Sequence, residues 1–441
     1  MPEEAALKAN KAFAGLKHLF RALSSRNFRL FISGQVISLL GTWMQQMAMS
    51  WMVYRLTHSA FMLGLVAFLS QAPGFFIAPM AGAMADRVNR HKLLIITQTL
   101  AMAQAFALAY LSLSGRIEVW HVLYLSIFMG VITGIDTPVR QSFVVDMLDK
   151  PENLSNAISL NSSVFNGTRL IGPAIAGIMI ATVGEGWCFF LNGTSYIAVI
   201  LALLSMRLTP KPVVQHTRSY LESVREGFSY AYHFPAMRAI LLLVALVSLA
   251  GLPYSVLVPV YARDILHGDA QTLGYLMGSV GAGALTGAFY LASRSNVLGL
   301  ARLIPIAAGL FGVTLVGFAF SHTLWLSMGL IYLLGLCMML QLASSNILLQ
   351  TLADEPMRGR VMSLYTMAFL GMTPFGSLMI GSMATHIGVS TTLLIGGCTC
   401  IAGAVLFSSR LSPLRKTVLP TYAQRGILQE SIPQQEVAKI R

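Results

Sequence analysis

Residues 82–92 read Gly82-Ala-Met-Ala-Asp86-Arg87-Val-Asn89-Arg90-His91-Lys92 and separate two apolar segments, 62–85 and 93–114. Each segment is long enough to cross a bilayer as a helix, which takes about 20 apolar residues. The charged stretch therefore predicts a tight turn at a membrane surface. There Asp86 can face the positive end of a helix, Arg87 and Arg90 can pair with it or with lipid phosphate, and Gly82 permits close helix packing.

The composition of the whole chain predicts an all-α membrane protein. Hydrophobic residues make up 55% of the 441 residues and charged residues only 11%, which is far from globular usage. Apolar runs predict twelve transmembrane helices, at 30–54, 62–85, 93–114, 119–145, 156–182, 186–206, 237–262, 272–293, 300–320, 324–350, 359–385 and 388–409.

The twelve spans divide into two halves of six helices. The predicted order is an amphipathic N-terminal segment (1–29), a first half (30–206), a linker (207–236), a second half (237–409) and a tail (410–441). A shift of 204 residues relates the halves, because it superposes five identical residues: Leu148, Ser159, Leu160, Gly172 and Gly177 fall on Leu352, Ser363, Leu364, Gly376 and Gly381. The halves are therefore predicted to be pseudo-symmetric.

The distribution of positive charge predicts the orientation. Most of the 30 Lys and Arg residues lie in the two tails and the even-numbered loops, so both termini are expected in the cytoplasm. This topology accounts for the net charge of +13 without a nucleic-acid partner. Residues 1–29 are expected to lie on the membrane surface and not to be a signal peptide.

Two ionisable residues lie four apart within the fourth span. On a helix, Asp136 and Arg140 share one face and can pair. A lone charge at the bilayer centre costs about 2.5–3.5 kcal/mol on insertion scales, so a pair is much less costly. The pair either fixes packing near Pro138 or acts as a proton site or substrate contact.

Arg169 lies in the fifth span, just before Gly172, Pro173 and Gly177. Its helix carries no carboxylate within one turn of it, so we expect it to reach Asp136 on the neighbouring helix and form one network of three ionisable residues. The Gly and Pro residues lower the cost of bending and let helices approach closely, which suits either a moving interface or simple packing.

The first span carries amide and aromatic side chains. Gln35, Trp43, Gln45 and Gln46 can hold a large, partly polar ligand by hydrogen bonds and stacking. The alternative is that some of them join helices to one another.

Two charged clusters are expected on the cytoplasmic side. Asp146, at the end of the fourth span, is placed to meet Arg87 or Arg90, and Asp354, Arg358 and Arg360 begin the eleventh span. We interpret both clusters as gating elements, with solvated loop charge as the alternative.

Several classes of protein are disfavoured. The His residues lie singly, so no metal site is expected, and no cofactor is indicated. There is no G-x-x-x-x-G-K-S/T motif to bind ATP in this chain. No nucleophile with a nearby base suggests an enzyme.

The 82–92 stretch resembles the loop between helices 2 and 3 of the major facilitator superfamily, G-x-x-x-D-R-x-G-R-R/K, with Asn89 in place of the usual Gly. The segment 172–177 resembles the G-P-x-x-G signature of antiporters in that superfamily, one residue longer. Further stretches are similar to the bacterial branch that contains the enterobactin exporter and macrolide efflux proteins: Asn27-Phe-Arg-Leu-Phe, Gly41-Thr-Trp-Met-Gln-Gln, Thr137-Pro-Val-Arg-Gln, Asn156-Ala-Ile-Ser-Leu-Asn and Arg358-Gly-Arg-Val-Met.

This resemblance implies a secondary transporter in a bacterial inner membrane. The expected activity is proton-coupled export of a siderophore-like or other small organic molecule by rocking of the two halves, with Asp136 as proton acceptor and Arg140 or Arg169 as its exchange partner. A broad-specificity drug/proton antiporter is the alternative, and a non-transporting membrane sensor is a minor one. The residues leave the substrate open.

Overall fold

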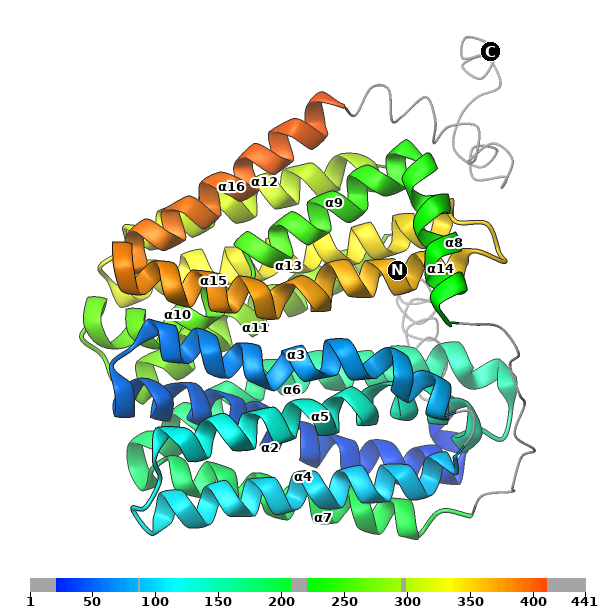
Figure 1. Cartoon of the computed structure of the whole chain (residues 1–441), viewed down its shortest axis with the longest axis horizontal. Helices are drawn as coiled ribbons and strands as arrows, with labels where there is room; N and C mark the ends of the chain where they lie inside the picture. The colour runs from blue at the N-terminus through cyan, green and yellow to red at the C-terminus, as the bar shows by residue number, and fades with distance from the viewer. Residues whose placement is uncertain (1–20, 86–87, 208–219, 295–298, 411–441) are drawn as a thin grey trace, which may run out of the picture.

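The computed structural model describes residues 21–85, 88–207, 220–294 and 299–410, and every regular element in these ranges is a helix. The predicted all-α class is confirmed. The predicted segment 1–29 lies mostly, and the predicted tail 410–441 almost entirely, outside the described residues. In Figure 1, the helices of the first half, blue to green, lie below those of the second half, green to orange.

Each of the twelve predicted spans is occupied by helix. The first half comprises α2 (Arg26–Thr57), α3 (Ala60–Ala85), α4 (Arg90–Leu113), α5 (Val119–Phe143), α6 (Leu154–Val183) and α7 (Glu185–Leu204), with short turns η1 (Arg21–Ser24), η2 (Val144–Met147) and η3 (Pro151–Asn153). The second half comprises α9 (Pro235–Ala250), α10 (Tyr254–Val260), η4 (Tyr261–Ile265), α11 (Ala270–Ala292), α12 (Leu300–Ala319), α13 (Leu324–Leu352), α14 (Arg358–Thr366), η5 (Met367–Gly371), α15 (Met372–Ile387) and α16 (Val389–Ser409). In the sequence, α8 (Tyr220–His233) lies between the two halves.

In the described part of the chain, eleven helical segments are long and apolar enough to cross a membrane. The remaining predicted span, 30–54, corresponds to α2, which is 32 residues long but carries Arg26, Arg29 and Arg55 near its ends and several amides and hydroxyls between them. Its polarity is explained by its position, because α2 packs against α6 and α7 inside the first half.

Two of the predicted spans are interrupted. The seventh breaks between α9 and α10 at a turn over residues 251–253. Pro253 lacks a backbone N–H, so it cannot continue the hydrogen bonding of α9. The eleventh contains the π-helical turn η5 between α14 and α15. Hydrophobicity alone does not signal such breaks, because the apolar run continues through them.

The same packing pattern occurs in both halves. In the first half α3 packs on α5, α4 on α7 and α2 on α7, and in the second half α11 packs on α13, α12 on α16 and α9 on α16. The structure therefore repeats one six-helix arrangement, as the shift of 204 residues suggested.

The halves meet through α3 against α15 and α6 against α11. Both crossings depend on glycine. A Cβ at Gly177 would lie 2.9 Å from Gly274 Cα, and a Cβ at Gly381 would lie 2.9 Å from Gly64 Cα. Any larger residue would push the helices apart, so the two contacts form only because these positions lack side chains.

These crossings lie at the end of the bundle that the sequence predicts to face outside the cell. At the same end, the Tyr54 hydroxyl of the first half donates a hydrogen bond to Asp264 Oδ2 of the second half. Arg263 lies over the Trp51 ring, with Cζ 6.0 Å from its centroid. The two halves are thus in contact at the predicted outer end.

We expect Gly381→Val to separate α3 from α15, because its Cβ would also meet Ala60 O at 2.7 Å and overpacking costs about 1–3 kcal/mol. The measurement is disulfide formation between Phe61→Cys and Thr385→Cys, since the Phe61 amide donates to Thr385 Oγ1 at 3.2 Å. Cross-linking should fall about tenfold. Gly329→Val is the control, because a Cβ there meets nothing within 4 Å. Equal cross-linking in both variants would contradict the assigned role of Gly381.

Candidate functional site

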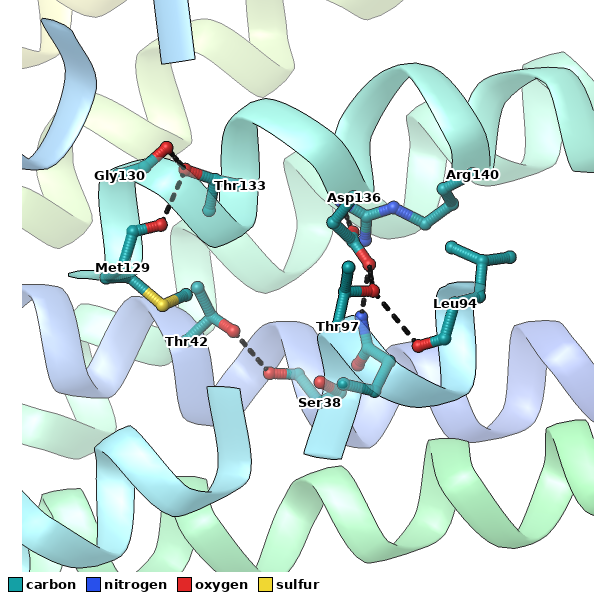
Figure 2. Close-up of polar contacts among 10 residues, drawn as sticks. Ser38, Thr42, Leu94, Thr97, Met129, Gly130, Thr133, Asp136 and Arg140 are labelled. Carbon is teal, nitrogen blue, oxygen red and sulfur yellow. Dashed lines mark hydrogen bonds and ion pairs between the residues drawn. The ribbon is translucent and has the colours of Figure 1, made fainter. Parts of the chain in front are cut away.

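Asp136 is the centre of a buried polar cluster between α4 and α5. Only 4% of the residue is exposed. Its Oδ1 accepts hydrogen bonds from Thr97 Oγ1 at 2.7 Å and Gln98 Nε2 at 2.8 Å. Its Oδ2 lies 3.2 Å from Arg140 Nη2. Figure 2 shows the Asp136 carboxylate pointing from α5 toward Thr97 on α4, with Arg140 beside it.

Helical geometry explains this cluster. The spacing of four residues places Asp136 and Arg140 on one face of α5, and α4 packs on α5 with Thr97 and Gln98 facing the carboxylate. The two donors and the arginine occupy both carboxylate oxygens, so the charge is compensated within the protein.

The Thr97 hydroxyl lies within hydrogen-bond distance of two acceptors. Its hydroxyl lies 2.7 Å from Asp136 Oδ1 and 3.0 Å from the Leu94 carbonyl oxygen. A hydroxyl has one proton to donate and two lone pairs to accept with. It can therefore donate to an ionised Asp136, or accept from a protonated Asp136 while donating to Leu94 (Figure 2).

Arg169 does not join this cluster, contrary to the expectation from sequence. In the described residues it forms no ion pair with Asp136. The reason is topological: α6 packs against α2 and α11, whereas α5 packs against α3 and α4. The expected network of three ionisable residues is replaced by Asp136, Arg140, Thr97 and Gln98.

Arg169 lies instead at the junction of the two halves. Its Cζ is 5.7 Å from the centroid of the Trp43 ring on α2. Its Nη2 is 3.9 Å from Met338 Sδ on α13 of the second half, and it lies within electrostatic range of Tyr254 on α10.

The amides of α2 have different environments. Gln45 Nε2 donates to Gln104 Oε1 at 3.1 Å, and Asn192 Nδ2 donates to Gln45 Oε1 at 2.8 Å. Gln45 is thus held on both sides by α4 and α7, in an arrangement that joins helices. Gln35 is buried, Trp43 is half-buried and Gln46 is exposed.

One of the two charged clusters expected on the cytoplasmic side lies partly within the described residues. Gly82 lies in the last turns of α3, and Asp86 and Arg87 lie outside the described residues. Arg90 Nη1 is 3.3 Å from Asp146 Oδ2, which links the start of α4 to η2. The Asn89 side chain caps α4 by accepting from the Lys92 amide at 3.1 Å.

The other cluster joins α8 to the start of α14. Arg360 Nη1 lies 2.5 Å from Glu226 Oε2, and the Tyr230 hydroxyl donates to Asp354 Oδ2 at 2.8 Å. Arg358 is exposed. Helix α8, which connects the two halves in the sequence, is thus attached to the second half through these residues.

The Gly and Pro residues of α6 lie at its helix contacts. A Cβ at Gly172 would be 2.6 Å from Trp43 Cβ, so Gly172 lets α2 and α6 approach, and Gly177 is the crossing point with α11. Pro173 lies inside α6, which runs unbroken from Leu154 to Val183. A bend at these residues stays a prediction.

Thr97 and Gln98 are the residues that sequence reasoning missed at this site. The available signal was a pair of polar residues in the third span, next to the span that carries Asp136. Met338 and Tyr254 were also missed, because apolar and aromatic residues are common in every span. Among the described residues, no group of three His, Cys, Asp or Glu side chains is arranged to hold a metal ion.

The fold and these buried charges define a membrane transporter of two pseudo-symmetric halves. Residues 18–435 match the family described as "Transmembrane secretion effector". The chain belongs to this family of the major facilitator superfamily.

Similar sequences and a similar solved structure are also transporters. The chain is 26% identical to the staphyloferrin A transporter of Staphylococcus aureus (86% of this chain, 95% of the relative) and 25% identical to the multidrug efflux pump Tap of Mycolicibacterium fortuitum (79% and 86%). It is 21% identical to macrolide efflux protein A of Streptococcus pyogenes (85% and 93%). The crystal structure of a D-xylose-proton symporter is similar in fold, with a TM-score of 0.68 and 14% identity (86% of this chain, 97% of that chain). The predicted family is confirmed, and its members are transporters and not enzymes.

We expect Gln45→Leu to destabilise the protein, because Gln104 Oε1 and Asn192 Nδ2 would lose their partner inside the bundle. Each unpaired buried group costs about 1–3 kcal/mol. The melting temperature of the purified variant should fall, while Gln46→Leu, at an exposed position, should leave it unchanged. A variant of unaltered stability but weakened ligand binding would instead return Gln45 to the substrate site.

Proposed function

We propose that this chain is a proton-coupled exporter of small organic molecules, siderophore-like or similar, that works by alternating access. The family description and the names of the relatives, a staphyloferrin A transporter and two efflux proteins, support export of such cargo. The proposed location is the inner membrane of a bacterium, with both termini in the cytoplasm.

The observation that carries the proposal is the environment of Asp136. A site that exchanges a proton during transport must provide hydrogen-bond partners for its carboxyl group in both the ionised and the protonated form. Thr97 can donate to the ionised group or accept from the protonated one, as its two acceptors at 2.7 and 3.0 Å allow. The Gln98 amide supports both states too, because rotation presents either its N–H or its oxygen. Within the described part of the chain, the Gln98 Oε1 is buried without a hydrogen-bond partner.

Arg140 is the proposed exchange partner. When Asp136 is ionised, the two side chains form an ion pair at 3.2 Å. Protonation from outside removes the negative charge and with it most of the attraction, so Arg140 is released and the inward-facing state is favoured. Loss of the proton to the cytoplasm restores the pair and completes the cycle.

The movement that this cycle drives is a rocking of the two halves about the glycine crossings. Asp86, Arg87, Arg90 and Asp146 are proposed to hold the cytoplasmic ends of α3, α4 and α5 together during closure. Arg358 and Arg360 with Asp354 are proposed to do the same on the second half, where Glu226 also pairs with Arg360.

Broad-specificity drug/proton antiport is the second candidate. One observation favours it: Phe68 and Phe75 of α3 contact Phe375 of α15 edge-to-face, with centroids 5.6 and 6.2 Å apart. Aromatic rings between the halves accept varied apolar molecules. A non-transporting membrane sensor is the minor alternative, and a family of transporters disfavours it.

Asp136→Asn should abolish gradient-driven efflux while leaving the protein folded in the membrane, because Asn keeps the shape of Asp but cannot take up a proton. The measurement compares supernatant metabolites and accumulation of a fluorescent dye panel in cells expressing either form, with and without a protonophore. Asp149→Asn, at an exposed position, is the matched control. Full efflux by Asp136→Asn would remove this residue from coupling.

Asp86→Ala should slow cycling far more than it weakens ligand binding, because a gating residue acts on the movement of the halves and not on the cargo. Efflux rate and equilibrium binding, measured on the same variant, separate the two effects. Unchanged turnover would reduce the 82–92 loop to a topological anchor.

A further inference from the structure

Arg169 is a cation near the middle of a membrane-spanning helix, and no carboxylate among the described residues pairs with it. It lies halfway along the 30 residues of α6. Among the residues that the structure describes, its side chain has one polar contact, with the weak acceptor Met338 Sδ at 3.9 Å. A guanidinium carries five N–H donors, so most of its hydrogen-bonding capacity is unused by the protein.

Two other arginines of the first half, in contrast, are paired with acids. Arg140 lies 3.2 Å from Asp136, and Arg55 Nε lies 2.8 Å from Glu185 Oε1. A charge inside the membrane is costly unless it is paired or faces a cavity, and such residues commonly mark substrate pathways. An arginine kept there without a counter-charge from the described part of the chain indicates a negative partner that comes from outside the protein.

The surroundings of Arg169 provide further groups for such a partner. The Trp43 ring lies beside the guanidinium, and its Nε1–H is buried without an acceptor among the residues that the structure describes. Gly172 permits this contact, because a Cβ there would meet Trp43 Cβ at 2.6 Å. Phe165 lies edge-to-face against Trp43, with centroids 5.4 Å apart. One unused cation, one unused neutral donor and aromatic walls thus lie together.

The site also draws on both halves. Trp43 and Arg169 belong to the first half, whereas Met338 and Tyr254 belong to the second. A ligand held here would therefore sense the relative position of the halves, which is what a transported molecule must do.

We propose that Arg169 and Trp43 form the anion-binding part of the cargo site, and that the cargo is an organic carboxylate with an apolar or aromatic body. The guanidinium donates to the carboxylate, the indole N–H donates to one of its oxygens, and the rings of Trp43 and Phe165 contact the body. This inference rests on the proposed function in that it takes the bound molecule to be cargo.

The test measures equilibrium binding by calorimetry to the full chain in lipid nanodiscs. The probes are 1-naphthoate, its neutral counterpart 1-naphthamide, and chloride. We expect 1-naphthoate to bind at least tenfold more tightly than 1-naphthamide. Arg169→Gln should remove this preference, and Arg169→Lys should retain part of it, because lysine keeps the charge but not the planar fork. Trp43→Phe should weaken 1-naphthoate binding about tenfold by deleting one donor to a charged group.

The control is Arg116→Gln, an exposed arginine in the turn between α4 and α5, which should bind both probes like the parent chain. Should Arg169→Gln fail to fold, Arg169→Lys and Trp43→Phe carry the test. Failure of the parent chain to bind 1-naphthoate, equal binding of the two organic probes, an unchanged preference in Arg169→Gln, or binding of chloride alone would each overturn the proposal.

The binding test is independent of proton coupling. Asp136→Asn should keep the preference for 1-naphthoate, because Asp136 lies in a different helix pair. If Asp136→Asn exports normally while Arg169→Gln loses the preference, carboxylate recognition stands and proton coupling through Asp136 fails. If Asp136→Asn loses export while Arg169→Gln keeps the preference, proton coupling through Asp136 stands and the cargo is recognised elsewhere.

Discussion

Close contact between the two halves depends on the absence of side chains at four positions. Inside a membrane, apolar side chains gain little by leaving lipid, so helices associate through tight packing of small residues. Gly64 with Gly381 and Gly177 with Gly274 allow α3 to reach α15 and α6 to reach α11. These crossings also bring Arg169 within 3.9 Å of Met338 in the other half. A bulkier residue would separate the halves and open the site that lies between them.

Arg140 and Arg169, the two half-buried arginines within the spans of the first half, have different surroundings. We assign them different tasks in the proposed function. Arg140 and Asp136 form a compensated cluster with residues of α4, within one half. Arg169 lies where the halves meet, and no acid among the described residues pairs with it. In the proposed cycle, proton exchange therefore takes place away from the cargo. The proposed link between them is mechanical: α3 packs on both α5 and α15, which connects the helix that carries Asp136 to the interface between the halves.

Much of the fold could be predicted because membrane spans are long and strongly apolar. The predicted span 300–320 is observed as Leu300–Ala319, and 272–293 as Ala270–Ala292. Of the site, the pairing of Asp136 with Arg140 follows from helical periodicity, and the structure brings Arg90 to Asp146. The position of Arg169 could not be predicted, because adjacency in sequence does not say which helices are neighbours. Gln45 shows the same difficulty, because the sequence does not distinguish a glutamine that binds a ligand from one that joins α2 to α4 and α7.

The sequence by itself determined the class of the protein, its twelve helical segments, its two related halves and its family, because hydrophobicity, periodicity and motif spacing are local properties of the chain. Only the tertiary structure decided which buried groups meet. It paired Thr97 and Gln98 with Asp136, excluded Arg169 from that cluster, and placed Arg169 with Trp43 between the halves. These outcomes depend on how helices distant in sequence cross, and the crossings are set by packing, above all by where glycine lets two backbones touch.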